Sequence, residues 1–270
     1  MPTSLAGIFA LSTVFFGSLV LIGLGLGYGL ERLAWSKGRK VFDVPKKRGQ
    51  LRTEIVGTLL FHVVWLPIIS VVLWSDTLRF SSTWAAELVT FPACWGAFQL
   101  LYYPVHRAMH TRKLFWMHRW HHESLVTSPM TGLSMHPAEA LAWAAMFLGP
   151  AFALAAMGLL GAKAWIAFLA IHWIGNVAGH ANAELFPLRA TRLSTLVWSN
   201  PISYHSLHHA RFDGHYGFVT AIMDRTFGTE WPDWLALHTR IMDGRPLTSL
   251  REKGPSEITS SRRTRTETRS

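Results

Sequence analysis

The sequence predicts an all-α fold, a polytopic membrane helix bundle of about four to five spans. Half of the 270 residues are hydrophobic, and the mean hydropathy of the chain is positive at +0.21. The apolar residues fall in long blocks, which is typical of a protein that lies in a bilayer. A helix of about 20 apolar residues is long enough to cross the hydrocarbon core.

The first apolar block, Leu5–Leu30, carries no charged residue. At a rise of about 1.5 Å per residue it is long enough to cross a core of about 30 Å. A cleaved signal peptide would have a basic start, a shorter apolar region and a small-residue cleavage site, and none of these is clear here. We therefore expect a retained anchor. Its glycines do not have dinucleotide-binding spacing, so we expect close helix packing at Gly23, Gly25, Gly27 and Gly29.

Four further apolar blocks follow, of which the last is short for a full crossing: Ile55–Trp74, Trp84–Val105, Pro137–Leu160 and Ala164–Gly179. The segment from Glu31 to Glu54 holds eight Lys or Arg residues against three acids. The positive-inside rule places this segment in the cytoplasm and the N-terminus outside. Alternate crossings, with a tight turn at residues 161–163, then bring three histidine-rich segments to the cytoplasmic face.

The chain is expected to have three parts. These are a membrane anchor with a basic loop over residues 1–50, a membrane domain over residues 51–250 and a disordered basic tail over residues 251–270. The net charge of +10 lies largely in the first loop and the C-terminal region. Membrane orientation and contact with anionic lipid account for it, so we expect no nucleic-acid partner. The lone Cys94 excludes a disulfide within the chain and a cysteine-based zinc site.

The histidine-rich segments share a helical spacing: "HRAMH" at 106–110, "HRWHH" at 118–122 and "HSLHH" at 205–209. Side chains at i, i+3 and i+4 share one helix face, so the histidines of each segment can point together. Eight neutral imidazoles have no use for their lone pairs in an apolar core, whereas transition metals use all of them. Eight ligands are too many for one ion. The pattern predicts a dimetal site at the cytoplasmic face and leaves iron, copper, nickel and zinc open.

Two longer stretches resemble the sterol desaturase and fatty acid hydroxylase superfamily of integral-membrane oxygenases. Residues 102–141 contain the first two histidine segments, and residues 204–229 contain the third and end in Asp-Arg-x-Phe-Gly-Thr. The resemblance implies that residues 51–250 form a catalytic domain of this type. It also implies a pair of iron ions, with dioxygen as co-substrate.

The resemblance assigns metal-binding and catalytic roles position by position to His106, His110, His118, His121, His122, His180, His205, His208 and His209. His136, in a His-Pro-x-Glu stretch, is a weaker candidate for a metal ligand, the alternative being that it supports the ligands. His172 is expected to hydrogen-bond within the bundle, with ligation as the alternative. His62 and His238 stand alone in the sequence, and ordinary structural roles are expected for both.

Three positions depart from the pattern of the superfamily. His215 stands where Asn is frequent, Ser134 where Arg is common and Gln99 where Asp is usual. The histidine segments stay intact, so the changes bear on hydrogen bonding around the ligands, on electron-donor docking and on the substrate. Whether His215 is itself a ligand is left open by the sequence.

The resemblance implies hydroxylation or desaturation of a lipid, which is a sterol, isoprenoid, ether lipid or fatty acyl chain. His106 and His110 are separated by three residues, as in the sterol-modifying branch of the superfamily. This spacing favours a sterol, isoprenoid or ether-lipid substrate. The sequence shows no haem, flavin or nicotinamide motif, so we expect a separate electron donor, a b-type cytochrome or a ferredoxin with its reductase. The expected location is the bacterial inner membrane or the endoplasmic reticulum. The alternative is a metal-binding transporter or sensor without redox turnover, which would favour ionisable groups along the spans.

Overall fold

The computed structural model describes residues 4–187 and 199–255. Every named element within these two stretches is helical, which confirms the predicted all-α fold. In chain order the elements are α1 (Leu5–Trp35), α2 (Gln50–Trp74), α3 (Trp84–Met109), α4 (Phe115–His118), the 3-10 helices η1 (His121–Glu123) and η2 (Pro129–Leu133), α5 (Pro137–Ala156), α6 (Ala162–Gly179), α8 (Ile202–Arg211), α9 (Ile222–Phe227) and α10 (Trp234–Met242).

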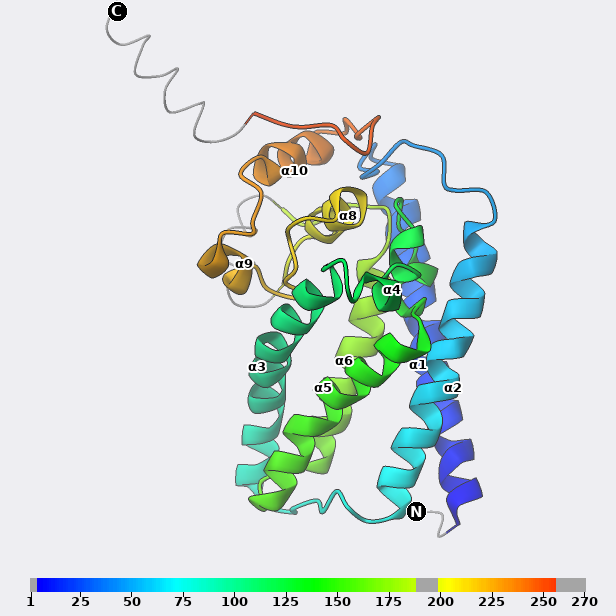
Figure 1. The fold of residues 1–270 in the computed structure, drawn as a ribbon, viewed down its shortest axis with the longest axis vertical. Coiled ribbons are helices and arrows are strands. Elements are labelled where there is room, and N and C mark those ends of the chain that lie inside the picture. The colour runs from blue at the N-terminus through cyan, green and yellow to red at the C-terminus, as the bar shows by residue number, and fades with distance from the viewer. Residues whose placement is uncertain (1–3, 188–198, 256–270) are drawn as a thin grey trace, which may run out of the picture.

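The five long helices α1, α2, α3, α5 and α6 form a bundle, and α8, α9 and α10 gather at one end of it (Figure 1). The N-terminus lies at the other end. Helix α6 packs against α1 and α3, and α5 packs against α2 and α3. The segment with α4, η1 and η2 connects α3 to α5 near α8, so the site-bearing segments meet at one end of the bundle.

Large aromatic side chains fill the interior of the bundle. The rings of Trp65 on α2 and Trp173 on α6 lie with centroids 4.8 Å apart, and Phe16 of α1 contacts both. Aromatic rings bury more apolar surface than other side chains, so this cluster holds three helices of the bundle together.

Two glycines of α1 allow the closest approach between the anchor and its neighbours. A Cβ atom on Gly23 would lie 2.8 Å from Val177 Cβ of α6, and one on Gly27 would lie 2.7 Å from Pro129 Cγ of η2. The predicted packing role is confirmed for these two positions. Gly25 and Gly29 face open space, so they do not share it.

Three of the described helices are long and apolar enough to cross a membrane, by length and composition: α1, α2 and α5. This count is slightly lower than the expected four to five spans. Helices α3 and α6 lie in the same bundle but carry buried polar residues, including Gln99 and His106 on α3 and His172 and Asn176 on α6. These residues lower the hydropathy of both helices and face the interior of the bundle, where the site is built.

Residues 251–255, the first residues of the predicted tail, contact the helical part of the chain. The Gly254 N–H donates to Asp233 at 3.0 Å, and Arg211 at the end of α8 donates to the Glu252 carbonyl at 2.7 Å. Arg211 also donates to both carboxylate oxygens of Asp233, at 2.9 Å each. These contacts tie the segment to α8 and to the start of α10. The rest of the predicted tail, residues 256–270, lies outside the described residues.

Candidate metal centre

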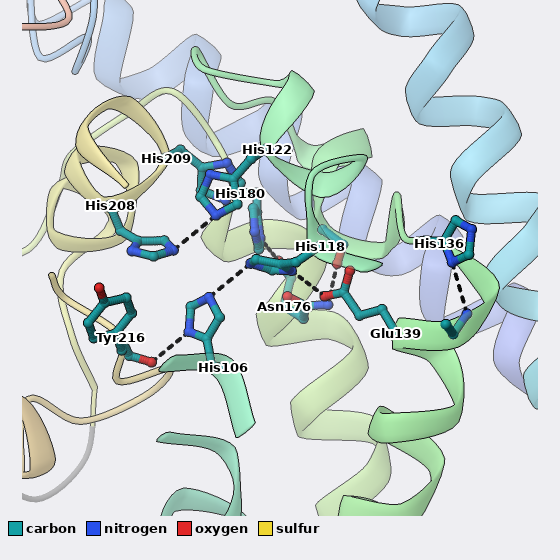
Figure 2. Close-up of polar contacts among 12 residues, drawn as sticks. His106, His118, His122, His136, Glu139, Asn176, His180, His208, His209 and Tyr216 are labelled. Atoms are coloured by element: carbon teal, nitrogen blue, oxygen red, sulfur yellow. Dashed lines mark hydrogen bonds and ion pairs between the residues drawn. The ribbon is translucent and has the colours of Figure 1, made fainter. Parts of the chain in front are cut away.

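Nine histidines meet at the end of the bundle next to α8, eight of them buried and His110 half-buried. Figure 2 labels His106, His118, His122, His180, His208 and His209 of this set. The nine histidines form two groups, and within each group the facing ring nitrogens all lie within 4.8 Å of one another. The first group is His106, His110, His118, His122 and His208, and the second group is His121, His180, His205 and His209. All nine positions assigned through the resemblance are thus brought together.

Each of the two His-x-x-His-His segments supplies histidines to both groups. His118 and His122 belong to the first group, whereas the adjacent His121 belongs to the second. In α8 the i and i+4 histidines belong to the second group, and His208 belongs to the first. Successive residues of a helix project about 100° apart, so one segment can supply neighbouring histidines to two separate centres. These two segments therefore each supply both groups, which adjoin at one end of the bundle.

The chain changes conformation between the histidines of the second segment. Helix α4 ends at His118, and η1 begins at His121. The third segment, by contrast, lies within the continuous helix α8, whose residues Ser203–Ala210 are all buried. A buried helix of this polarity is stable only if its polar groups find partners, and the histidine groups provide them.

The first group contains a pair of rings whose tautomers are fixed by their partners. His106 Nδ1 lies 2.7 Å from the Tyr216 carbonyl oxygen, and His118 Nδ1 lies 2.8 Å from Glu139 Oε1 (Figure 2). A carbonyl and a carboxylate only accept, so both Nδ1 atoms carry the proton and donate. The two Nε2 atoms, 3.0 Å apart, then face each other with lone pairs. Two lone pairs at this distance repel unless a cation lies between them, which is the arrangement expected of metal ligands.

Three further histidines donate Nδ1–H to backbone carbonyls. The acceptors are Gly214 for His208 at 2.7 Å, Ser124 for His209 at 3.1 Å and Asn176 for His180 at 2.6 Å. A bound hydrogen at Nδ1 directs the lone pair of Nε2 into the centre of the group. Burial lowers the pKa of His118, His121 and His122 well below its ordinary value, so these rings are neutral at neutral pH.

The spacing of the nitrogens fits an ion in each group. Metal–nitrogen bonds of about 2.1 Å at right angles put neighbouring nitrogens about 3.0 Å apart. The close Nε2 pairs are His106–His118 at 3.0 Å, His122–His208 at 3.1 Å, His180–His205 at 2.9 Å and His205–His209 at 3.2 Å. An all-imidazole donor set suits iron, copper, nickel or zinc, so the residues present fit the iron that the resemblance implies.

Buried carboxylates hold the loops around the histidines. The sequence predicted no role for them. Asp224, in the Asp-Arg-x-Phe-Gly-Thr stretch, accepts from the backbone N–H of Tyr216 and Gly217 at 2.8 Å each and from Thr229 Oγ1 at 2.7 Å. It thereby fixes the loop whose Tyr216 carbonyl orients His106. The signal was present in the sequence, because an acid next to an apolar stretch needs polar partners.

Glu54, in the second turn of α2, has the same role on the other side of the centre. Its carboxylate accepts from Ser124 Oγ at 2.9 Å, Ser128 Oγ at 2.8 Å and Thr131 Oγ1 at 2.7 Å. The carbonyl of Ser124 in turn orients His209. These three partners of Glu54 are 70 to 77 positions away in the chain, so the sequence alone offered no means of finding them.

The remaining candidate histidines lie outside both groups. His136 caps α5, where its Nδ1 accepts from the Ala138 N–H at 3.1 Å, and it lies to one side of the centre (Figure 2). His215 accepts from the Trp231 N–H at Nε2 and donates from Nδ1 to the Tyr204 carbonyl, each at 3.0 Å, so neither nitrogen is available to a metal. His172 donates to the Phe168 carbonyl at 3.0 Å within α6, as expected of a bundle residue.

Comparison with known proteins agrees with this site. The fatty acid hydroxylase family matches residues 91–229, which include all nine histidines. Protein CER1-like 1 of Arabidopsis thaliana is 35% identical over 139 residues, 50% of this chain and 22% of that protein. Very-long-chain aldehyde decarbonylase GL1-4 of Oryza sativa subsp. indica is 30% identical over 207 residues, 72% of this chain and 31% of that protein. No solved structure matches the chain.

Fold and site together define a membrane helix bundle with two adjoining polyhistidine groups at one end. The chain belongs to the fatty acid hydroxylase family, whose match covers more than half of its residues. The resemblance seen in the sequence is confirmed, and with it membership of a family of oxidative enzymes. The chain spans less than a third of the length of these two curated relatives.

Proposed function

We propose that the chain is a membrane oxygenase that uses two iron ions and dioxygen to hydroxylate or desaturate a lipid. The observation that carries this proposal is the His106–His118 pair, whose Nε2 lone pairs face each other at 3.0 Å in a buried site. Seven more ring nitrogens complete two sets of donors around this pair and beside it. Such a donor set has no structural use without metal.

The two ions, when bound, supply the activation of dioxygen that oxidation of an unactivated C–H bond requires. The residues of the chain do the rest. The nine histidines would hold the ions, and His106, His118 and His208 would do so through Nε2, because the Tyr216 carbonyl, Glu139 and the Gly214 carbonyl accept their Nδ1–H groups. Burial of eight of the nine histidines excludes bulk water from the centre, which limits side reactions.

For the substrate and the electron donor, only the chemical class is proposed. The family points to a lipid, and the names of the very-long-chain aldehyde decarbonylases among its relatives add very-long-chain aldehydes to the sterol, isoprenoid, ether-lipid and fatty acyl candidates. Electrons are proposed to come from a b-type cytochrome or a ferredoxin with its reductase, at the cytoplasmic face of the membrane. A transporter or sensor is less well supported, because the nine histidines gather at one end of the bundle.

The proposal is tested by metal analysis and turnover of the purified membrane protein. We expect about two iron ions per chain, and dioxygen consumption when lipid extract and a reductant are supplied. His121→Ala and His208→Ala each remove a ligand from one group and should lower iron content and abolish product. His62→Ala is the matched control, because His62 lies on α2 outside both groups. Metal-free protein with full activity, or full activity in both ligand variants, would overturn the proposal.

A further inference from the structure

A cavity of about 400 Å³ lies against the second histidine group. His180 and His205 of that group form part of its lining, and no histidine of the first group does. The rest of the wall is mostly apolar and includes Trp95 of α3 and Phe218. The cavity therefore gives access to one of the two centres only.

The cavity follows the outer side of α6 towards the metal centre. Its lining residues on α6 extend from Ile171 to Gly179, and His180 follows directly. Nine steps along a helix cover about 14 Å. Ile171 is 43% exposed, whereas His180 is 1% exposed. The cavity thus leads from the surface of the bundle, where membrane lipid is available, to a buried ligand.

Glycine leaves open volume in this wall. A Cβ atom on Gly175 or on Gly179 would have no neighbour within 4 Å, in contrast to Gly23 and Gly27, which are needed for packing. Glycine within a helix is less stable than alanine, so the missing side chains at Gly175 and Gly179 lower the stability of α6. Here both glycines border the cavity, and their missing side chains leave it wide beside the second group.

Two lining residues have buried polar atoms without partners. His172 Nδ1 donates to the Phe168 carbonyl, which leaves Nε2 with no hydrogen bond. Asn176 Nδ2 donates to the Gly132 carbonyl at 2.6 Å, which leaves Oδ1 with none. Both residues are 2% exposed. Unpartnered buried acceptors are rare in folded proteins. A hydrocarbon chain offers them no hydrogen, so the occupant of the cavity is inferred from its apolar lining and its position.

We propose that this cavity binds the hydrocarbon chain of the substrate, which enters from the bilayer near Ile171 and reaches the second group at His180 and His205. The absence of a side chain at Gly175 leaves space for that hydrocarbon chain. The inference rests on the proposed function and adds to it the side from which the substrate approaches. A single flexible chain suits an apolar cavity that ends at buried ligands, because the chain can enter from lipid without being exposed to water.

The test uses the full chain in lipid nanodiscs and a photoreactive octadecanol with a terminal diazirine. Cross-linked peptides are mapped by mass spectrometry, and iron content is measured in parallel. Wild-type protein should be labelled at residues that line the cavity. Gly175→Phe should lower that labelling several-fold, because the ring occupies the chain's place, while iron content stays unchanged. Gly149→Phe on α5 is the matched control, because Gly149 is also an exposed helical glycine without close neighbours and lies outside the described cavities.

Equal labelling of wild type and Gly175→Phe would overturn the inference. Labelling confined to the apolar cavity of about 510 Å³ between α1, α2 and α6, which no histidine lines, would also overturn it. If Gly175→Phe fails to fold, Gly175→Leu provides the same comparison. Labelling and iron content need no turnover. Cavity labelling without lipid oxidation in wild type would therefore reject the proposed function alone, and oxidation unaffected by Gly175→Phe would reject the cavity assignment alone.

Discussion

At the scale of single residues, the centre depends on acceptors that hold the Nδ1 side of five imidazoles, those of His106, His118, His180, His208 and His209. Glu139 is the strongest of them, because it is a buried carboxylate 2.8 Å from His118 Nδ1. Charge-assisted hydrogen bonds are stronger than those to a carbonyl, and a carboxylate partner raises the basicity of the ligand nitrogen. Glu139 is therefore expected to matter for metal affinity without touching the metal.

Glu139→Gln should weaken metal binding by the first group by about 10–100-fold, because the amide keeps the shape of the side chain but loses its charge. The measurement is iron release against a graded series of chelator concentrations, with metal content read by mass spectrometry. Glu123→Gln is the control, since Glu123 lies close by but pairs with Lys47 at the surface. Identical release curves for the Glu139 variant and wild type would show that the carboxylate has no such role.

Among the elements, α8 and the α4–η1 segment each serve both groups. His208 and His209 are neighbours on α8 but belong to different groups, as do His121 and His122 on η1. Each centre is therefore assembled from both segments and cannot form on either one alone. This exchange makes the two centres structurally dependent on one another.

Pairs of substitutions should reveal the exchange. His122→Ala with His208→Ala removes two ligands of the first group, so about one iron ion per chain should remain, because the second group is intact. His121→Ala with His122→Ala removes one ligand from each group, although the two positions are adjacent, and should weaken both ions. Iron content of the two double variants, measured after the same dialysis, checks this. Loss of one ion in the adjacent pair and of both in the distant pair would contradict the assignment.

The packing of α1 against η2 is a second feature at the level of secondary-structure elements. Gly27→Val places a side chain where Pro129 lies and should destabilise the protein by about 1–3 kcal/mol, because the two backbones must separate. Gly25→Val is the control, since a Cβ atom there meets nothing within 4 Å. Thermal unfolding in detergent, followed by tryptophan fluorescence, compares the two. A lower midpoint in the Gly25 variant than in the Gly27 variant would be evidence against this interface.

For the whole molecule, the main feature is that every histidine of the site lies at the same end of the bundle. Segments from α3, η1, α6 and α8 converge there, and the N-terminus lies at the opposite end (Figure 1). Under the proposed orientation, the basic loop after α1 faces the cytoplasm and the N-terminus faces outwards. Electrons would then arrive on the side where the centre lies, and lipid would arrive from the bilayer.

Cysteine labelling tests this orientation. Ser4→Cys and Arg48→Cys are both exposed positions, at the two ends of the bundle, and the native Cys94 is fully buried. In intact cells a membrane-impermeant maleimide should label Ser4→Cys only, and Arg48→Cys should react after permeabilisation. The reverse pattern would place the histidine centre on the outside of the membrane.

Much of the molecule follows from local sequence signals. Long apolar blocks predict helices because their backbone groups must be paired in lipid, and the structure confirms an all-helical fold over the described residues. Close histidines at helical spacing predict a metal site, because the lone pairs of their ring nitrogens would otherwise have no partner in an apolar core. Eight of the nine positions lie in three segments with helical histidine spacing, whereas His180 was assigned only through the resemblance to the superfamily.

The division of those histidines between two centres was decided by the tertiary structure. Sequence spacing suggested that His118, His121 and His122 share a face, but the break between α4 and η1 and the approach of α8 send His121 to the other group. The hydrogen-bond partners of Glu54 and Glu139 could not be predicted from the sequence either, because these bonds join loops and helices that are far apart in the chain. Local spacing fixes which side chains can share a face; only the packing of distant helices decides which atoms meet.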